Sequence, residues 1–141
     1  MTKSQAIVQV IEIPSDPVHI NRIESQTEML AKRVGFDEDE CVNLGIAVTE
    51  VVANAITHGN KKDANKKVVV TFRYSESFIE ISIRDQGKGF KPENVDDPLK
   101  PENLYKESGR GIFIVKSLMD KVSYNFYDNG SEVVLFKSIP K

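Results

Sequence analysis

Cysteine, basic excess and long apolar runs are all scarce in this sequence, and each shortage excludes a class of protein. Cys41 is the only cysteine, so an internal disulfide and a cysteine-rich zinc site are excluded. The net charge of −2 leaves no basic surplus for a nucleic-acid backbone, so direct nucleic-acid binding is not expected. No apolar run is long enough for a membrane span. Residues 1–5 lead into a strand-like segment without the apolar core of a signal peptide, so the expected compartment is the cytoplasm.

The remaining composition indicates a folded chain of one domain. Hydrophobic residues make up 40% and charged residues 28% of the sequence, which argues against disorder. A chain of 141 residues suits one compact unit rather than two. We therefore assign residues 1–141 to a single domain.

Five segments are rich in β-branched residues or alternate between apolar and polar residues, and this pattern predicts strands. They are Ala6–Ile13, Val68–Tyr74, Phe78–Asp85, Ser123–Tyr127 and Glu132–Ser138. Three further segments predict helices. The first begins at the cap residue Asp16 and ends at Gly35. The second starts in the acidic run 37–40, with Asp37 as its cap, and is apolar almost all round from Val42 to Ile56, which predicts a largely buried helix. The third opens at residues 108–111.

The order of these elements favours an α+β fold. Helices are interspersed among the strands, but neighbouring strands form hairpins. This order predicts a two-layer sandwich whose mixed, mostly antiparallel sheet is covered on one face by helices. The polar segment 91–107 shows no clear period, and a loop of this length in a small domain is usually functional or mobile.

A polar stripe runs along the apolar second helix. Glu50, Asn54 and His58 are spaced four residues apart, so they share one helical face. Burial of a carboxylate and an amide costs free energy unless they have partners. One interpretation is that they form hydrogen bonds with neighbouring helices and specify packing. For His58, at the helix end, we expect a structural role.

An acidic residue ends the strand Phe78–Asp85. Asp85 has the same parity as the aliphatic residues of this strand, so its carboxylate should lie at the edge of the core. Gly87 and Gly89 follow, and glycines allow another molecule to approach the backbone closely. Such an acceptor in an apolar pocket is suited to an exocyclic amine such as that of adenine. An ordinary turn is the alternative interpretation, because Asp and Gly are frequent in turns.

Gly109, Arg110 and Gly111 stand at the start of the third helix. Glycines there leave backbone N–H groups open, and the helix dipole favours anions. Arg110 adds a cation whose planar geometry matches phosphate. The alternative is a flexible loop that enters a helix with a solvated arginine.

Together the three features describe one nucleotide pocket. Asp85 and the apolar floor would hold adenine, and the start of the third helix would hold the phosphates. Asn54 would offer an oxygen to Mg²⁺, a hard cation that takes oxygen ligands beside phosphate. Glu50, one turn earlier, would stand next to the terminal phosphate, and segment 91–107 would act as a lid.

These motifs resemble the ATPase family shared by gyrase, the ninety-kilodalton heat-shock chaperone, histidine kinases and MutL. Residues 47–60 (AVTEVVANAITHGN) resemble its N box, residues 85–90 (DQGKGF) its first glycine box, and residues 109–115 (GRGIFIV) its second. Within that family the sequence resembles the bacterial anti-sigma-factor serine kinases. The N box ends in His-Gly, and the second glycine box continues into Leu118-Met119-Asp120. We also expect no phosphoacceptor-histidine helix pair ahead of the domain.

The resemblance implies a Bergerat-type ATP-binding fold and a role for each matching residue. Glu50 would be the base for the hydroxyl of a protein substrate, Asn54 the Mg²⁺ ligand and Asp85 the partner of the adenine amine. Ser131 stands where relatives usually have a threonine that helps to hold adenine. Arg22, on the first helix, would contact a partner protein.

The resemblance also implies partners and an activity. The chain would phosphorylate a small STAS-fold anti-anti-sigma protein and sequester a sigma factor or an analogous regulator. Pairing of an edge strand such as Ala6–Ile13 would allow a homodimer. The alternative, from a different functional class, is a binding module that uses ATP only to set its shape. A structural domain without a ligand would require all three motifs to be coincidental.

Overall fold

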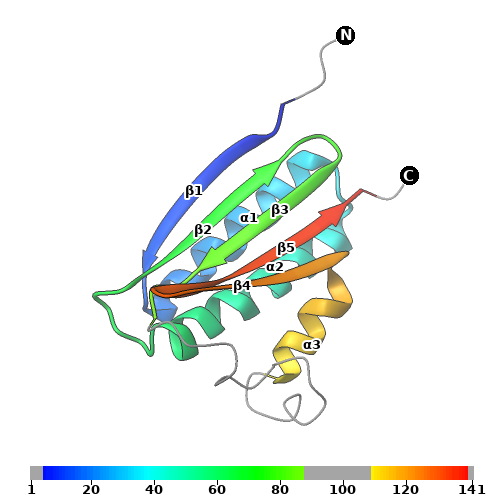
Figure 1. Ribbon diagram of the computed structural model, residues 1–141. Coiled ribbons are helices and arrows are strands. Elements are labelled where there is room, and N and C mark those ends of the chain that lie inside the picture. Colours follow the sequence, from blue (N-terminus) through cyan, green and yellow to red (C-terminus); the bar gives the residue numbers. More distant parts are fainter. Residues whose placement is uncertain (1–4, 88–108, 140–141) are drawn as a thin grey trace.

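The computed structural model describes residues 5–87 and 109–139, which form one sheet and a layer of helices (Figure 1). The strands are β1 (Ile7–Pro14), β2 (Lys67–Tyr74), β3 (Phe78–Arg84), β4 (Lys121–Tyr127) and β5 (Gly130–Ser138). The helices are α1 (Ile20–Val34), α2 (Glu38–Asn54) and α3 (Gly109–Leu118), with a 3₁₀ turn at Pro17–His19 and a π-helical turn at Ala55–Gly59. The predicted lid, residues 91–107, lies outside the described residues.

The strands are arranged in the order β1-β2-β3-β5-β4, and every pairing is antiparallel. The helices lie on one side of this sheet (Figure 1). The predicted α+β sandwich is therefore confirmed. The prediction of a mixed sheet is wrong. β5 lies beside β3 and runs antiparallel to it, whereas β4, which runs antiparallel to β5, would have been parallel to β3 in that place. Within residues 5–87 and 109–139 the sheet has no parallel pair.

The core lies between the sheet and the helices. On β3 the alternate residues Ile79, Ile81 and Ile83 are buried, and β2 shows the same alternation. Successive side chains of a strand point to opposite faces, so this alternation means that the helices cover one face of the sheet. The fully buried helical side chains include Ile23, Leu30, Leu44, Val48 and Val52.

Local signals place both ends of α1. The Asp16 carboxylate accepts a hydrogen bond from Val18 N (3.0 Å) at the start of the 3₁₀ turn that leads into the helix. Gly35 follows the last helical residue with a φ of 119°, a left-handed conformation that glycine adopts without steric cost. Both ends agree with the prediction.

α2 packs against α1, α3 and the sheet. Its N-terminus is capped by Asp37, whose Oδ1 accepts a hydrogen bond from Glu40 N (2.8 Å). The continuous helical stretch Glu38–Gly59 has 22 residues and contains an 18-residue window with a mean hydropathy of 1.2. It therefore meets the length and composition of a membrane span, contrary to the expectation from the sequence. Half of that window is buried inside the protein, which is the pattern of a core helix.

The end of α2 departs from a regular α-helix in a way that the sequence did not indicate. The turn Ala55–Gly59 is π-helical, and Asn60 N donates a hydrogen bond to Ala55 O (2.8 Å) to close it. Lys61 and Lys62 then have φ values of 52° and 59°, in the left-handed region that non-glycine residues rarely occupy. π-helical turns occur frequently at functional sites.

The C-terminal end of α3 is fixed to β5 by polar contacts. Asp120 Oδ2 accepts hydrogen bonds from Ser138 N (2.8 Å) and Ser138 Oγ (3.0 Å). Lys137 Nζ donates to Leu118 O (2.9 Å), one of the last carbonyls of the helix. The hydrogen bond from the Ser138 backbone is the main cause that holds the pKa of the Asp120 carboxyl below its ordinary value.

We expect Asp120→Asn to destabilise the fold in a pH-dependent way. Because the pKa is lower in the folded state, the charged carboxylate stabilises the fold above the unfolded-state pKa. This contribution disappears as the pH falls through the folded-state pKa. The variant should lose about 0.5–1 kcal/mol of unfolding free energy at neutral pH, a value reduced for solvent screening, and match the wild type in acid. Urea unfolding at several pH values measures the difference, with Asp128→Asn in the exposed β4–β5 turn as the control. A constant difference across the pH range would contradict the assignment.

Candidate functional site

The carboxylate of Asp85 is the centre of the site. It lies directly after β3 and is 7% exposed, with the inward parity predicted from the sequence. Oδ1 accepts hydrogen bonds from Gly87 N (3.1 Å) and Ser131 N (3.2 Å), and Oδ2 accepts one from Ser131 Oγ (2.7 Å). A carboxylate has about four acceptor positions, so roughly one remains for a further donor.

Three glycines bring the backbone close to this carboxylate. A β-carbon on Gly59 would overlap the Asp85 side chain, and one on Gly87 would overlap the carbonyl of Gly59. Gly130 has a φ of 149°, and a β-carbon there would overlap the carbonyl of Asp85. The end of α2, the segment after β3 and the start of β5 therefore meet at Asp85. None of these three positions has room for a side chain.

The polar stripe on α2 extends from this meeting point. Asn54 is the last residue of α2, one π-helical turn before Gly59, and Glu50 lies one α-helical turn earlier. Both side chains are half-buried, and neither forms a hydrogen bond or ion pair with another residue in the described part of the chain. Hydrogen bonding to neighbouring helices, the alternative considered from the sequence, therefore has no support among those residues.

His58 does not join this stripe. His58 lies inside the π-helical turn Ala55–Gly59, and it is exposed, whereas Glu50 and Asn54 are half-buried. Its side chain is exposed and forms no hydrogen bond with any residue of 5–87 or 109–139. The structural role expected for His58 is taken instead by Asn60.

Asn60 was not recognised from the sequence. Its side chain is 1% exposed. Nδ2 donates to Ser15 Oγ (2.7 Å) and Lys67 O (2.9 Å), and Oδ1 accepts from Gln86 N (2.7 Å). The only available signal was an asparagine directly after the glycine that ends an apolar helix, a position where a polar side chain commonly bonds the backbone.

The predicted phosphate-binding residues are placed only in part. Gly109 begins α3, with Arg110 and Gly111 in its first turn, and α3 packs against α2. Figure 1 shows the start of α3 and the C-terminal end of α2 at the same end of the sandwich. The side chain of Arg110 and all of Gly89 lie outside the described residues. The structure thus brings Asp85, Gly87 and Ser131 into contact and leaves the phosphate side as a prediction.

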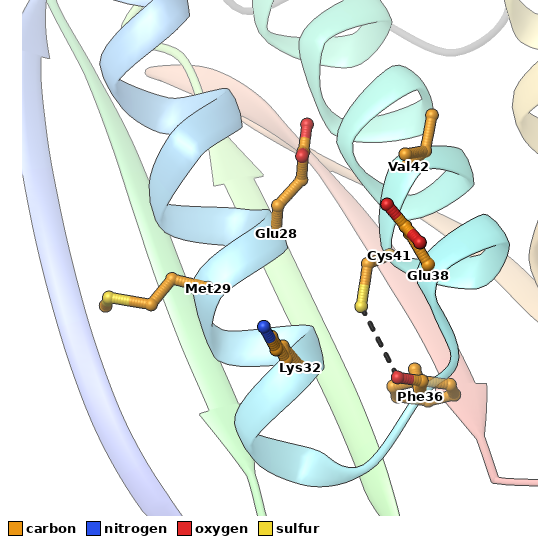
Figure 2. Close-up of a pocket in the computed structure, with 7 residues that line it drawn as sticks. All are labelled: Glu28, Met29, Lys32, Phe36, Glu38, Cys41 and Val42. Atoms are coloured by element: carbon orange, nitrogen blue, oxygen red, sulfur yellow. Dashed lines mark hydrogen bonds between the residues drawn. The ribbon is translucent and has the colours of Figure 1, made fainter.

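A separate hollow lies between α1 and the first turns of α2 (Figure 2). It has a volume of about 440 Å³. Its lining residues are Glu28, Met29, Lys32, Phe36, Glu38, Cys41 and Val42. Burial, reinforced by nearby acidic residues, raises the pKa of the Cys41 thiol, whose Sγ lies 3.6 Å from Phe36 O. Cys41 and Asn54 are separated by roughly 20 Å along the helix, at 1.5 Å per residue, so this hollow is not part of the site.

Comparison with known protein families identifies the class of protein to which this fold and site belong. Residues 13–137 match the family of the histidine kinase-like ATPase domain, and the chain belongs to that family. Within it, the chain belongs to the RsbW serine-protein kinases. The RsbW of Bacillus licheniformis is 31% identical over 130 residues, which cover 88% of this chain and 81% of that protein. This membership makes the chain an ATP-using serine/threonine-protein kinase of the anti-sigma-factor type.

Other comparisons agree with this assignment. The RsbW of Bacillus subtilis strain 168 is 29% identical over 126 residues, 85% of this chain and 79% of that protein. The RsbU and RsbW domains of Rv1364c from Mycobacterium tuberculosis superpose with a TM-score of 0.68 at 17% identity, over 95% of this chain and 33% of that one. The mycobacterial sensor histidine kinase MprB superposes with a TM-score of 0.57 at 16% sequence identity, over 94% of this chain and 97% of that one. At these identities the solved structures show the fold alone, and they confirm the predicted fold class.

We expect Gly59→Ala to disturb the site through steric overlap. The added methyl group would collide with the carboxylate of Asp85, and such overpacking costs about 1–3 kcal/mol. Thermal unfolding without ligand measures the loss, and Thr57→Ala in the same turn is the control. A Gly59→Ala protein as stable as the wild type would contradict the close approach.

We expect Asp85→Asn to weaken ADP binding about tenfold or more, which corresponds to roughly 1.4 kcal/mol. The amide replaces an acceptor oxygen with a donor, so the remaining acceptor position is lost or must be shared. Ser131→Ala keeps the carboxylate and removes one donor to it, so its effect should be smaller. Calorimetric titration with Mg-ADP, corrected for the folded fraction of each variant, compares the two. Unchanged affinity in Asp85→Asn would remove this residue from nucleotide binding.

Proposed function

We propose that this chain transfers the γ-phosphoryl group of ATP to a serine or threonine of a small STAS-fold anti-anti-sigma protein. We further propose that it sequesters a sigma factor or an analogous regulator in the cytoplasm. The observation that carries the proposal is the buried carboxylate of Asp85, directly after β3 and in contact with Gly59, which retains an acceptor position in an RsbW-type kinase. The names of the relatives support the kinase class, and the partners are our inference.

Adenine recognition is assigned to the Asp85 side of the site. The free acceptor position of the carboxylate would bind the exocyclic amine, while Ser131 and Gly87 hold the carboxylate in place. A preorganised acceptor of this kind favours a base with an amino group over one with a carbonyl, because a carbonyl oxygen would face the remaining acceptor position of the carboxylate without a hydrogen between them.

Phosphate binding is assigned to the start of α3 and to the glycine box. Backbone N–H groups of Gly109 and Gly111 at a helix N-terminus favour an anion, as would the backbone at Gly89. Arg110 would add a planar cation for the terminal phosphates. The packing of α3 on α2 supports this assignment, because it links the phosphate side with the helix that carries Glu50.

Mg²⁺ fits the donor set that α2 offers. Asn54 carries an amide oxygen that is half-buried and unshared with the side chains of the described residues, and Mg²⁺ takes oxygen ligands beside phosphates. Asn54 would therefore hold the ion. When bound, the ion would neutralise phosphate charge during phosphoryl transfer.

Glu50 would act as the base. It accepts the proton of the substrate hydroxyl as the hydroxyl oxygen forms a bond to the γ-phosphorus. The bond between the γ-phosphorus and the bridging oxygen breaks at the same time, and ADP leaves with that electron pair. The products are a phosphorylated serine or threonine, ADP and the proton held on Glu50. The place of Glu50 one helical turn from Asn54 supports this role.

Two surfaces are candidates for protein partners. Arg22 is exposed on α1 and would contact a partner protein. β1 has a single neighbour among the described strands, and Ile7, Val8 and Val10 are 51%, 57% and 60% exposed. An edge strand with exposed apolar residues is suited to pair with a second copy, so we include a homodimer in the proposal.

We expect Glu50→Ala and Glu50→Gln to abolish phosphoryl transfer and leave Mg-ATP binding within about twofold of the wild type. The reason is that a base acts on the hydroxyl and not on the bound nucleotide. Transfer of radiolabel to a candidate STAS substrate measures activity, and calorimetry measures binding. Glu38→Ala, at the other end of α2, is the control and should retain both. Undiminished transfer by either Glu50 variant would remove Glu50 from the mechanism.

A further inference from the structure

We propose that Asn60 is a positioning residue for adenine recognition, a role that rests on the proposed binding of ATP at Asp85. Asn60 lies beyond the last glycine of the π-helical turn and contacts neither Asp85 nor Ser131 through a hydrogen bond. It acts through the backbone N–H of Gln86, the residue that stands between Asp85 and Gly87 in the glycine box.

The first step of the argument is the saturation of the Asn60 side chain. Both hydrogens of Nδ2 are used, by Ser15 Oγ and Lys67 O, and Oδ1 accepts from Gln86 N at 2.7 Å. The side chain is 1% exposed, so each of these bonds is shielded from water. Three segments that are distant in sequence are therefore joined at one amide group.

The second step is the position of Gln86. Its backbone N–H is bound by Asn60, and its own Oε1 accepts from Lys67 N at 2.7 Å. Gln86 is thus held from both its main chain and its side chain, between Asp85 and Gly87. With the Gln86 peptide fixed, the N–H of Gly87 points back to Asp85 Oδ1 at 3.1 Å.

The third step is the steric restriction on Gly87. This residue packs directly on the carbonyl of Gly59, which lies one residue before Asn60. Asn60 therefore fixes the two sides of one contact: its backbone follows Gly59, and its side chain binds the residue before Gly87. A shift of either side would move the donor that orients the Asp85 carboxylate. The expected consequence is a loss of preference for adenine, beyond any loss of stability.

Asn60→Ala tests this role, with the ratio of ADP affinity to GDP affinity as the readout. We expect ADP affinity to fall at least tenfold and the ratio to fall by a similar factor, because the acceptor for the adenine amine is no longer held in place. A residue that only stabilises the fold would reduce the folded fraction, which lowers both affinities equally and leaves the ratio unchanged. Titration calorimetry with Mg-ADP and Mg-GDP measures both, on protein shown by circular dichroism to be folded.

Ser15→Ala is the matched control. It removes one partner of Asn60 and the hydrogen bond from Ser15 Oγ to Lys66 O (2.7 Å), but leaves the bond between Asn60 and Gln86. It should lower the unfolding temperature and retain the ADP-to-GDP ratio within about twofold. If Ser15→Ala lowered the ADP-to-GDP affinity ratio as much as Asn60→Ala does, the effect would come from destabilisation of the fold in general, and the proposal would be overturned.

Asn60→Asp provides a second test where the alanine variant does not fold. It keeps an oxygen for the Gln86 N–H and removes both N–H donors, so the ratio should stay within about threefold of the wild type. Loss of discrimination in Asn60→Asp, or an unchanged ratio in folded Asn60→Ala, would overturn the role of Asn60. A wild-type protein that does not prefer ADP to GDP would instead overturn the part of the proposed function that assigns adenine recognition to Asp85.

Discussion

The burial of one carboxylate, that of Asp85, is the constraint on which the rest of the site depends. A buried charge is costly unless hydrogen bonds replace the water that it loses. Two backbone N–H groups and one hydroxyl supply them, from Gly87 and Ser131. To bring these donors close, the end of α2 and the starts of two other segments must approach without side chains, and glycine stands at each contact.

α2 combines two roles that normally exclude one another. Its apolar residues, such as Val48 and Val52, are fully buried and hold the sheet and the helices together. Its last turns carry Glu50 and Asn54, which have no partner among the described residues. Polar groups without partners destabilise a core. Glu50 and Asn54 lie in the last turns of α2, just before the turn that ends at Gly59, and this position is consistent with a ligand that supplies the missing partners.

The parts of this structure that follow local rules could be predicted from the sequence. The parity of Ile79, Ile81, Ile83 and Asp85 predicted the inward carboxylate, and the caps at Asp16 and Asp37 predicted the helix starts. The resemblance to a known family supplied Ser131, which does bond Asp85. The parity and the caps depend on the residue itself or on its near neighbours, whereas the bond between Ser131 and Asp85 spans 46 residues and was indicated by the resemblance alone.

Features that depend on distant contacts could not be predicted. Asn60 binds Ser15, 45 residues away, and Gln86, 26 residues away, so its role leaves no periodic pattern. The π-helical turn before Asn60 also has no signal in the sequence. The sheet is fully antiparallel because β5, and not β4, pairs with β3. The sequence of a hairpin alone does not decide which of its two strands pairs with the rest of the sheet.

The buried thiol of Cys41 has a practical consequence. It is the only thiol in the chain, it lies in the α1–α2 interface, and its raised pKa keeps it in the unreactive protonated form. An alkylating reagent would therefore reach the 7% exposed thiol slowly in the folded protein, through the hollow that it lines, and much faster when these two helices separate. Each modified molecule would gain the mass of one adduct at a known position. The chain thus contains its own reporter of helix separation, which can be read by mass spectrometry without an engineered label.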